Sequence, residues 1–375
     1  MFKLYLKKLT TISLFLILFF SAFISSATAQ NKKAKVVFIS VAAETEIFWG
    51  GIHGLAKAAA KDLGIDFEIL FSNRSHITAM NMAQEVCRRE DKPDYVIVVG
   101  EKLIASRSIP VLTQNGIKVF MYGSLSREEK ELIGEPREKY PDYIGKIAID
   151  DYMAGYLTAE LMAKEAIKKQ LYDKNGFINF LAFEGVRKTS FSSERVRGLN
   201  DILKKYPKVR ILQSIPTDWT YEYASNSLPI LIKRYAEYKI AGVWCANSNL
   251  ARACSDVLKS QGKIPGKDFV TAGTDWDNNS VKSVNQGDVL GVAGGHVAIA
   301  AWIVTLIHDY HNGIDFDSSV YLNKVTVMDQ VSSSKFLKYF KGDNWDFVDF
   351  TRYSKAENVH LKKYDLSFQA ILNDL

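Results

Sequence analysis

The sequence predicts an α/β protein made of two doubly wound parallel-sheet lobes, and three observations support this. Short apolar, β-rich runs alternate with longer stretches of helical spacing, which is typical of strands and helices in a parallel sheet. The alternation runs to Tyr122 and restarts after Asp150. With 375 residues, 47% of them hydrophobic, the chain is long enough for two such units.

The first unit is predicted from its elements in order. Its first helix carries apolar residues on one face, with Trp49, Ile52 and Leu55 among them. We expect strands over 36–41, 67–71, 95–99 and 118–122, with helices over 48–63, 77–89 and about 106–114.

The second unit repeats the pattern. We expect helices over 153–168, 192–204, 221–235, 250–260 and 297–310, and strands over 177–183, 210–215, 242–245, 269–272 and 289–293. The first lobe is predicted to comprise 30–149 plus about 296–322, and the second 150–295 plus about 323–331. Residues 332–375 form a C-terminal extension that packs on the lobes. The lobes are joined by a multi-crossing hinge with one crossing near 148–151.

The first 29 residues are predicted to be a signal peptide. Lysines at 3, 7 and 8 precede an apolar run over 14–24, and Ala27-Thr28-Ala29 supplies the small residues of a cleavage site. An uncleaved anchor is the alternative, but the run is short for a bilayer span. Cleavage before Gln30 predicts a soluble, periplasmic mature protein.

Charge and cysteine content exclude some classes of protein. Removing the signal peptide takes away three lysines and no acids, leaving a formal charge of +3, too small and dispersed for nucleic-acid binding. Cys245 and Cys254 are close enough in sequence to pair, but buried free thiols are an equal alternative for these two and for Cys87. No cofactor is implied. His308 and His311 lie one helical turn apart, and without a third ligand no metal site is predicted.

Polar and aromatic residues gather where strands end. Ligands of open α/β sheets bind beyond the carboxyl ends of the strands, so opposed lobes would share one ligand between them. Four segments of this kind follow each other along the chain: Phe48-Trp49; Glu184-Gly185 with Thr189-Ser190 and Ser193-Glu194-Arg195-x-x-Gly198; Trp244-Cys245-Ala246-Asn247; and Ala272-Gly273-Thr274-Asp275.

With these segments the chain resembles the ribose- and galactose-binding class of type I periplasmic binding proteins over about residues 34–330. It also has some similarity to autoinducer-2 receptors. The resemblance implies two lobes that close around a small polar ligand, with Arg195 in contact with it. The chain departs from the class at Gly123-Ser124, where Asp-Arg is common, and at Gly294-Gly295-His296 in the last binding loop. These departures concern the ligand and leave the fold expectation unchanged.

Each candidate ligand-binding residue has a structural alternative. The planar guanidinium of Arg195 suits two ligand oxygens, but it could be a surface arginine beside Glu194. Aromatic rings stack on the C–H face of a sugar, or they pack in the core. We expect Phe48 to face the cleft, since Trp49 fits the apolar stripe of its helix. Trp276 is expected to close an aromatic sandwich, or else to anchor a docking partner.

The polar candidates complete this set. Asn247 and Asp275 together suit vicinal hydroxyls, although either could cap the following helix. His296 could bond the ligand or cap a helix. Glu101 and Tyr122 end strands and are further candidate contacts.

Binding is the function that this pattern favours, because no Walker loop, nucleophile elbow or His-Glu-x-x-His motif occurs and no helix-turn-helix precedes the first lobe. The expected function is capture of a sugar or sugar-like polyol for an inner-membrane ABC permease. A sensory receptor that signals to a membrane sensor protein is the alternative, favoured by the long C-terminal extension. An enzyme on the same fold is the third reading.

Overall fold

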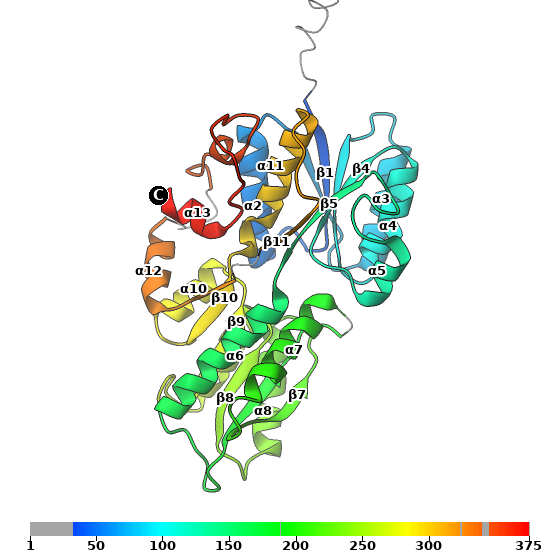
Figure 1. Cartoon of the computed structure of the whole chain (residues 1–375). Coiled ribbons are helices and arrows are strands. Elements are labelled where there is room, and N and C mark those ends of the chain that lie inside the picture. The colour runs from blue at the N-terminus through cyan, green and yellow to red at the C-terminus, as the bar shows by residue number, and fades with distance from the viewer. Residues whose placement is uncertain (1–32, 188, 323–324, 340–344, 375) are drawn as a thin grey trace, which may run out of the picture.

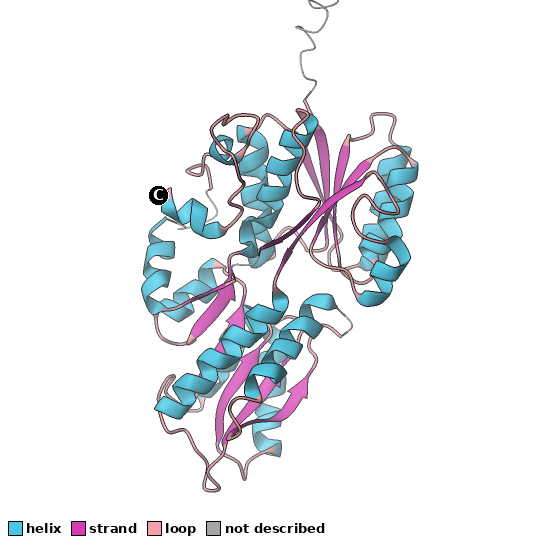
Figure 2. Ribbon diagram, viewed as in Figure 1, coloured by secondary structure: helices cyan, strands magenta, loops and turns pink. Residues whose placement is uncertain are grey.

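The structure is a computed structural model that describes residues 33–374 except 188, 323–324 and 340–344. The predicted signal peptide lies outside the described residues. Two six-stranded sheets, each with helices on both faces, make up the chain (Figures 1 and 2). The α/β class and the two parallel-dominated sheets agree with the sequence prediction.

The first sheet has the strand order β11-β5-β4-β3-β1-β2, and all its pairings are parallel. Its strands are β1 (Lys35–Ser40), β2 (Asp66–Phe71), β3 (Tyr95–Val99), β4 (Lys118–Tyr122), β5 (Tyr143–Ile149) and β11 (Ser319–Leu322). Its helices are α2 (Ile47–Asp62), α3 (His76–Arg88), α4 (Ile104–Gln114), α5 (Arg127–Ile133) and α11 (Ile299–His311). Helices α2 and α11 pack side by side on one face (Figure 1).

The second sheet has the order β12-β10-β9-β8-β6-β7, and only β12 is antiparallel to its neighbour. Its strands are β6 (Ile178–Phe183), β7 (Val209–Ile215), β8 (Ile240–Cys245), β9 (Val270–Thr274), β10 (Gly291–Gly294) and β12 (Thr326–Met328). Its helices are α6 (Asp151–Lys168), α7 (Ser190–Leu203), α8 (Tyr221–Arg234), α9 (Ser248–Ser260) and α10 (Asn278–Asn285).

Along the described strands, the chain changes from one sheet to the other three times. It crosses from β5 into α6 at Asp150, from β10 through the short helix η1 (His296–Ala298) into α11, and from β11 to β12. The carboxyl ends of β5 and β10 therefore lie beside the crossings. Loops that follow the other strands of each sheet are brought toward the same region.

The C-terminal segment packs against elements of both sheets. It contains α12 (Gln330–Tyr339), η2 (Phe350–Tyr353) and α13 (Phe368–Asn373). Tyr353 stacks edge-on against Trp302 of α11 with ring centroids 5.1 Å apart. On the other side, Asn285 of α10 donates a hydrogen bond of 2.8 Å to Ser334. Buried Asp309 of α11 accepts bonds from this segment, including one of 2.6 Å from Tyr364.

Sequence patterns missed the short elements. Helices α5 and α10 have seven and eight residues, which is too few for a clear apolar period, although each begins with a capping box. The strand predicted over 289–293 lies at Gly291–Gly294 instead. The three cysteines are buried free thiols, and the Sγ atoms of Cys245 and Cys254 are 3.8 Å apart.

Candidate functional site

Arg195 lies at the centre of the site and is a buried residue of α7. Its side chain is 6% exposed. The Nε atom donates to Oδ1 of Asp151 at 2.8 Å, and Nη1 donates to the carbonyl oxygen of Ala246 at 2.7 Å. A second carboxylate, Asp275, lies 3.5 Å from Nη1. No bond from Nη2 is found among the described residues, so its two hydrogens remain for a ligand.

Close helix packing fixes this arginine in place. Helix α7 is capped by Thr189, whose side chain accepts a hydrogen bond from the backbone N–H of Ser192. Helices α6 and α7 then cross so tightly that a Cβ added to Gly155 would overlap the carbonyl oxygen of Arg195. A Cβ on Gly198 would overlap α6 in the same way. The α6–α7 pair therefore works as one rigid support for Arg195.

The guanidinium of Arg195 lies beside two buried carboxylates, Asp151 and Asp275, whose pKa values shift in opposite directions. Burial raises the pKa of Asp151 above its usual value, despite the opposing charge of Arg195. Burial also acts on Asp275, but the charge of Arg195 and the hydrogen bond from His296 outweigh it, so the pKa of Asp275 is lowered. Asp275 is therefore the more readily ionised of these two carboxylates.

His296 completes this polar group. Its Nε2 lies 3.0 Å from Oδ1 of Asp275, and an ionised carboxylate only accepts, so Nε2 carries the proton. The Nδ1 atom is buried and has no hydrogen-bond partner among the described residues. The ring also lies 5.2 Å from that of Phe48, between centroids. His296 thus links the polar group of the second sheet to the aromatic wall of the first.

Aromatic rings from both sheets face the same space. From the first sheet come Phe48 and Trp49 at the start of α2, with the Trp49 ring centroid 5.5 Å from that of Tyr122. From the second sheet come Phe191 and Trp219, with the Trp219 ring 5.8 Å from the Arg195 guanidinium carbon. Flat apolar faces on two sides are what a sugar ring needs for stacking.

These residues enclose a cavity of about 610 Å³ between the two sheets. It is lined by eight of the nine residues predicted from the sequence: Phe48, Trp49, Glu101, Tyr122, Arg195, Asn247, Asp275 and His296. Both aromatics at the start of α2 reach it, although Trp49 is the more buried of the two. The structure therefore brings these eight residues together; their contact with a ligand remains a prediction.

Trp276 is the exception, and the expectation that it closes an aromatic sandwich is wrong. Its Nε1 donates to the carbonyl oxygen of Val292 at 2.9 Å, inside the second sheet. Its ring packs edge-on against Phe336 of α12 and Phe368 of α13, with centroids 6.2 and 5.6 Å away. The C-terminal segment provides an apolar shell for this indole, which is therefore directed away from the cavity.

Asn247 shows that the capping alternative and the site are compatible. Its Oδ1 accepts a bond of 2.9 Å from the backbone of Leu250 and so caps α9. Its Nδ2 donates to the carbonyl oxygen of Trp219 at 3.0 Å. Each of these two groups keeps one further hydrogen-bonding position for a ligand. The residue therefore fixes the Trp219 loop while it lines the cavity.

Glu101 is a buried acid at the edge of the cavity. Its side chain lines the cavity, the residue is 7% exposed, and burial raises its pKa. No hydrogen bond to its carboxyl group is found within the described part of the chain. Its carboxyl oxygens can therefore accept hydrogen bonds from a ligand hydroxyl.

Sequence analysis missed several lining residues. Phe191 lies between Ser190 and Arg195, in the segment from which Arg195 was predicted, but it was not itself among the predicted site residues. Trp219 follows β7 in a left-handed conformation with φ of 72°, and its ring lies where any side chain on Gly185 would stand. Arg74 pairs with Glu46, its Nε 2.9 Å from Oε1. An aromatic residue shortly after a strand was the available signal for Trp219.

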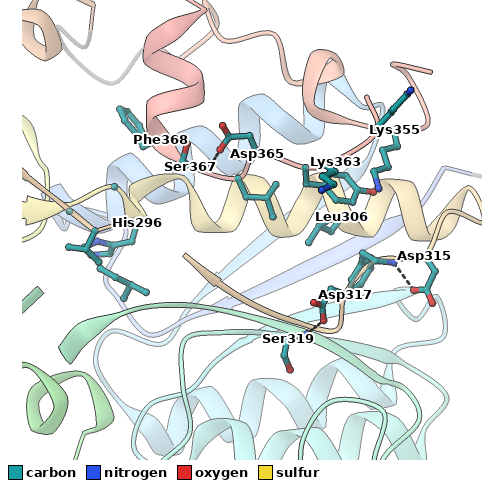
Figure 3. Close-up of a pocket in the computed structure, with 18 residues that line it drawn as sticks. His296, Leu306, Asp315, Asp317, Ser319, Lys355, Lys363, Asp365, Ser367 and Phe368 are labelled. Atoms are coloured by element: carbon teal, nitrogen blue, oxygen red, sulfur yellow. Dashed lines mark hydrogen bonds between the residues drawn. The ribbon is translucent and has the colours of Figure 1, made fainter. Parts of the chain in front are cut away.

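A second cavity of about 810 Å³ also borders His296 (Figure 3). It runs between α11 and the C-terminal segment. Leu306 of α11 lines it, and Lys355 and Lys363 lie at the end away from His296 (Figure 3). Asp315 at that end is already paired with Arg137. The described residues contain no cluster of three potential metal ligands, and no described helix is long and apolar enough to span a bilayer.

Comparison with known proteins finds relatives over most of the chain. A family model described as "Periplasmic binding protein domain" matches residues 36–314. A xylitol-binding protein of Mycolicibacterium smegmatis is 26% identical over 163 residues, 43% of this chain and 43% of that protein. The galactofuranose-binding protein YtfQ of Escherichia coli is 23% identical over 147 residues, 39% of this chain and 44% of that protein. The chain thus matches less than half the length of these curated relatives.

Solved structures are similar over a longer span. A periplasmic sugar-binding protein from Pseudomonas fluorescens has a TM-score of 0.80 at 27% identity, covering 90% of this chain and 99% of that one. A galactofuranose binding protein has a TM-score of 0.70 at 19% identity, covering 83% of this chain and 100% of that one. The likenesses confirm the type I two-lobed fold predicted from the sequence.

Proposed function

The chain belongs to the periplasmic binding protein family, and from that premise we propose that it captures a sugar or sugar-like polyol in the cavity between its two sheets. The observation that carries the proposal is the pairing of a buried, fixed guanidinium with aromatic walls from both sheets. The names of its relatives, which describe xylitol and galactofuranose binding, support the same ligand class.

The geometry suits a neutral polyhydroxylated ligand. Nη2 of Arg195 supplies two donors, Asp275 and Glu101 supply acceptors, and Asn247 supplies both kinds of group. The Trp49 and Trp219 rings offer C–H stacking without any charge on the ligand. Micromolar binding requires about 8 kcal/mol, which stacking and several buried hydrogen bonds can provide.

Binding would close the two lobes. A ligand in the cavity touches groups from both sheets only when the lobes are close together, so it favours the closed state by differential contact. The chain crossings beside Ile149 and Gly294 are segments that would bend. In this proposal the protein works in the periplasm and delivers its ligand to an inner-membrane ABC permease.

The direct test is a thermal-shift screen over sugars, polyols and autoinducer-2, followed by calorimetry on each hit. Arg195→Ala and Asp275→Ala are expected to abolish binding, whereas Arg197→Ala, an exposed arginine on the same helix, is expected to retain it. A hit that binds both site variants as tightly as the wild type would overturn the site. Recovery of the ligand in altered form would favour the enzyme alternative.

A sensory role is the second candidate. It is favoured by the C-terminal segment, which packs against Trp276, the residue that follows Asp275 of the cavity. Uptake of labelled ligand by spheroplasts of the source organism separates the two roles. An importer component predicts that added purified protein restores uptake. A receptor predicts unchanged uptake and a ligand-dependent response of a membrane sensor.

A further inference from the structure

Two loops from opposite sheets touch beside the cavity. Ser190, at the start of α7, donates a hydrogen bond of 3.0 Å from its hydroxyl to the carbonyl oxygen of Ser124, just after β4. The neighbours of these two serines are also in contact, because the ring of Phe191 lies against Gly123. Both Phe191 and Gly123 line the cavity. This is a direct contact between the two lobes at the wall of the site.

The contact between Phe191 and Gly123 depends on the absence of a side chain at position 123. A Cβ built on Gly123 would stand 2.7 Å from Cζ and 2.9 Å from Cε1 of Phe191, closer than such atoms pack. The backbone of Gly123 has a φ of 96°, which glycine adopts without strain. Its amide is held by a 2.7 Å bond to the carbonyl oxygen of Ile147, so the loop has little freedom to move aside.

Phe191 is also tied to the arginine of the site. It precedes Arg195 by four residues on α7, so the two side chains share one face of the helix. The tight α6–α7 crossing that fixes Arg195 therefore fixes the position from which the Phe191 ring extends. The ring is half-buried, with one side on Gly123 and another bordering the cavity.

We propose that Phe191 determines the size of ligand that the cavity accepts, by crossing to Gly123 and closing the cavity wall beside Arg195 so that only a single sugar ring or a short polyol fits. This inference rests on the proposed function. It assigns Phe191 and Gly123 as a matched pair: the ring holds the lobes together only while position 123 has no side chain.

The first test is a cycle of variants, using calorimetry with D-ribose, D-arabinose, D-galactose, D-xylose and xylitol. For whichever of these binds the wild type, Gly123→Ala is expected to weaken binding at least tenfold, because its methyl group displaces the ring. Phe191→Ala is expected to weaken it about three- to tenfold. The double variant is expected to match Phe191→Ala within twofold, since the methyl group then has no ring to meet.

The matched control is Gly50→Ala in α2, where an added Cβ meets no atom within 4 Å, and its affinity is expected to stay within twofold of the wild type. Left-handed strain at position 123 is present in both the single and the double variant. Rescue by Phe191→Ala therefore isolates the ring contact. A double variant as weak as Gly123→Ala would overturn the proposal.

The second test does not depend on Gly123. Phe191→Ala is expected to bind the methyl glycoside of the preferred sugar, relative to the free sugar, at least fivefold better than the wild type does; when xylitol alone binds, maltitol takes the place of the glycoside. An unchanged ratio would overturn the size-limiting role while leaving sugar binding intact. If none of the five probes binds the wild type, the proposed function itself fails and this inference fails with it.

Discussion

Asp151 accepts a 2.8 Å hydrogen bond from Nε of Arg195, and the two side chains are 4% and 6% exposed. Asp151 is the first residue of α6, directly after the chain leaves the first sheet, and Arg195 is on α7. The bond therefore joins one of the crossings between sheets to the centre of the cavity. A ligand that contacts Arg195 would therefore be connected, through Asp151, to the crossing between β5 and α6.

Removing Arg195 is expected to cost stability as well as binding. Arg195→Ala leaves Asp151 buried and unpaired, which is expected to lower the free energy of unfolding by about 3–5 kcal/mol. Urea unfolding at pH 7 measures this. Arg197→Ala is the control, because its partner Glu194 is exposed and such pairs contribute at most about 1 kcal/mol. Equal losses in both variants would contradict the buried pairing.

Gly155→Ala is expected to disrupt the support of the arginine. The added methyl group would overlap the carbonyl oxygen of Arg195 and push α6 away from α7, so a loss of about 3 kcal/mol or more is expected. Thermal and urea unfolding measure it. Gly50→Ala, in an open part of α2, is expected to stabilise by about 0.5–1 kcal/mol, as alanine does in helices. A stable Gly155→Ala variant would show that the helix crossing is not tight.

His53 is expected to make stability depend on pH. Burial lowers its pKa from 6.5 to about 4, and its Nε2 lies 2.9 Å from the hydroxyl of Ser40. Between those two values the unfolded chain binds more protons than the folded one. The stabilisation is therefore complete above pH 6.5 and is lost as pH falls towards 4, by up to about 3 kcal/mol.

Urea unfolding between pH 4 and 8 tests this dependence. His53→Gln is expected to flatten the slope between pH 4 and 6.5, because its amide does not titrate in that range. His360→Gln, at an exposed position, is expected to leave the slope as in the wild type. A slope that survives His53→Gln would assign the pH dependence to another group.

The C-terminal segment is expected to stabilise the protein through Trp276. Phe368→Ala removes a buried ring 5.6 Å from the indole, which is expected to cost about 3–5 kcal/mol. Val359→Ala, in the same segment but 82% exposed, is expected to change stability by less than about 0.5 kcal/mol. Differential scanning calorimetry compares the two. Comparable melting temperatures would mean that the segment packs loosely.

Much of the site could be predicted because of a rule of parallel sheets. Strand ends in one sheet share an edge, so Asn247 after β8 and Asp275 after β9 were expected to be neighbours from their positions alone. The same rule predicted Glu101 and Tyr122 as site residues, because each lies at the end of a strand of the first sheet. It did not reach Asp151, because the strand before it, β5, was not among the predicted strands, or Phe191, which lies eight positions after the end of β6.

The amino-acid sequence determined the two-sheet α/β architecture and eight residues of the cavity, because alternating apolar periods and strand-end residues are local patterns. Only the tertiary structure decided that Trp276 packs against the C-terminal segment, that Asp151 accepts a hydrogen bond from Arg195, and that the ring of Phe191 lies against Gly123. Each of these contacts joins residues between 44 and 92 positions apart, through close packing of surfaces that no local pattern records.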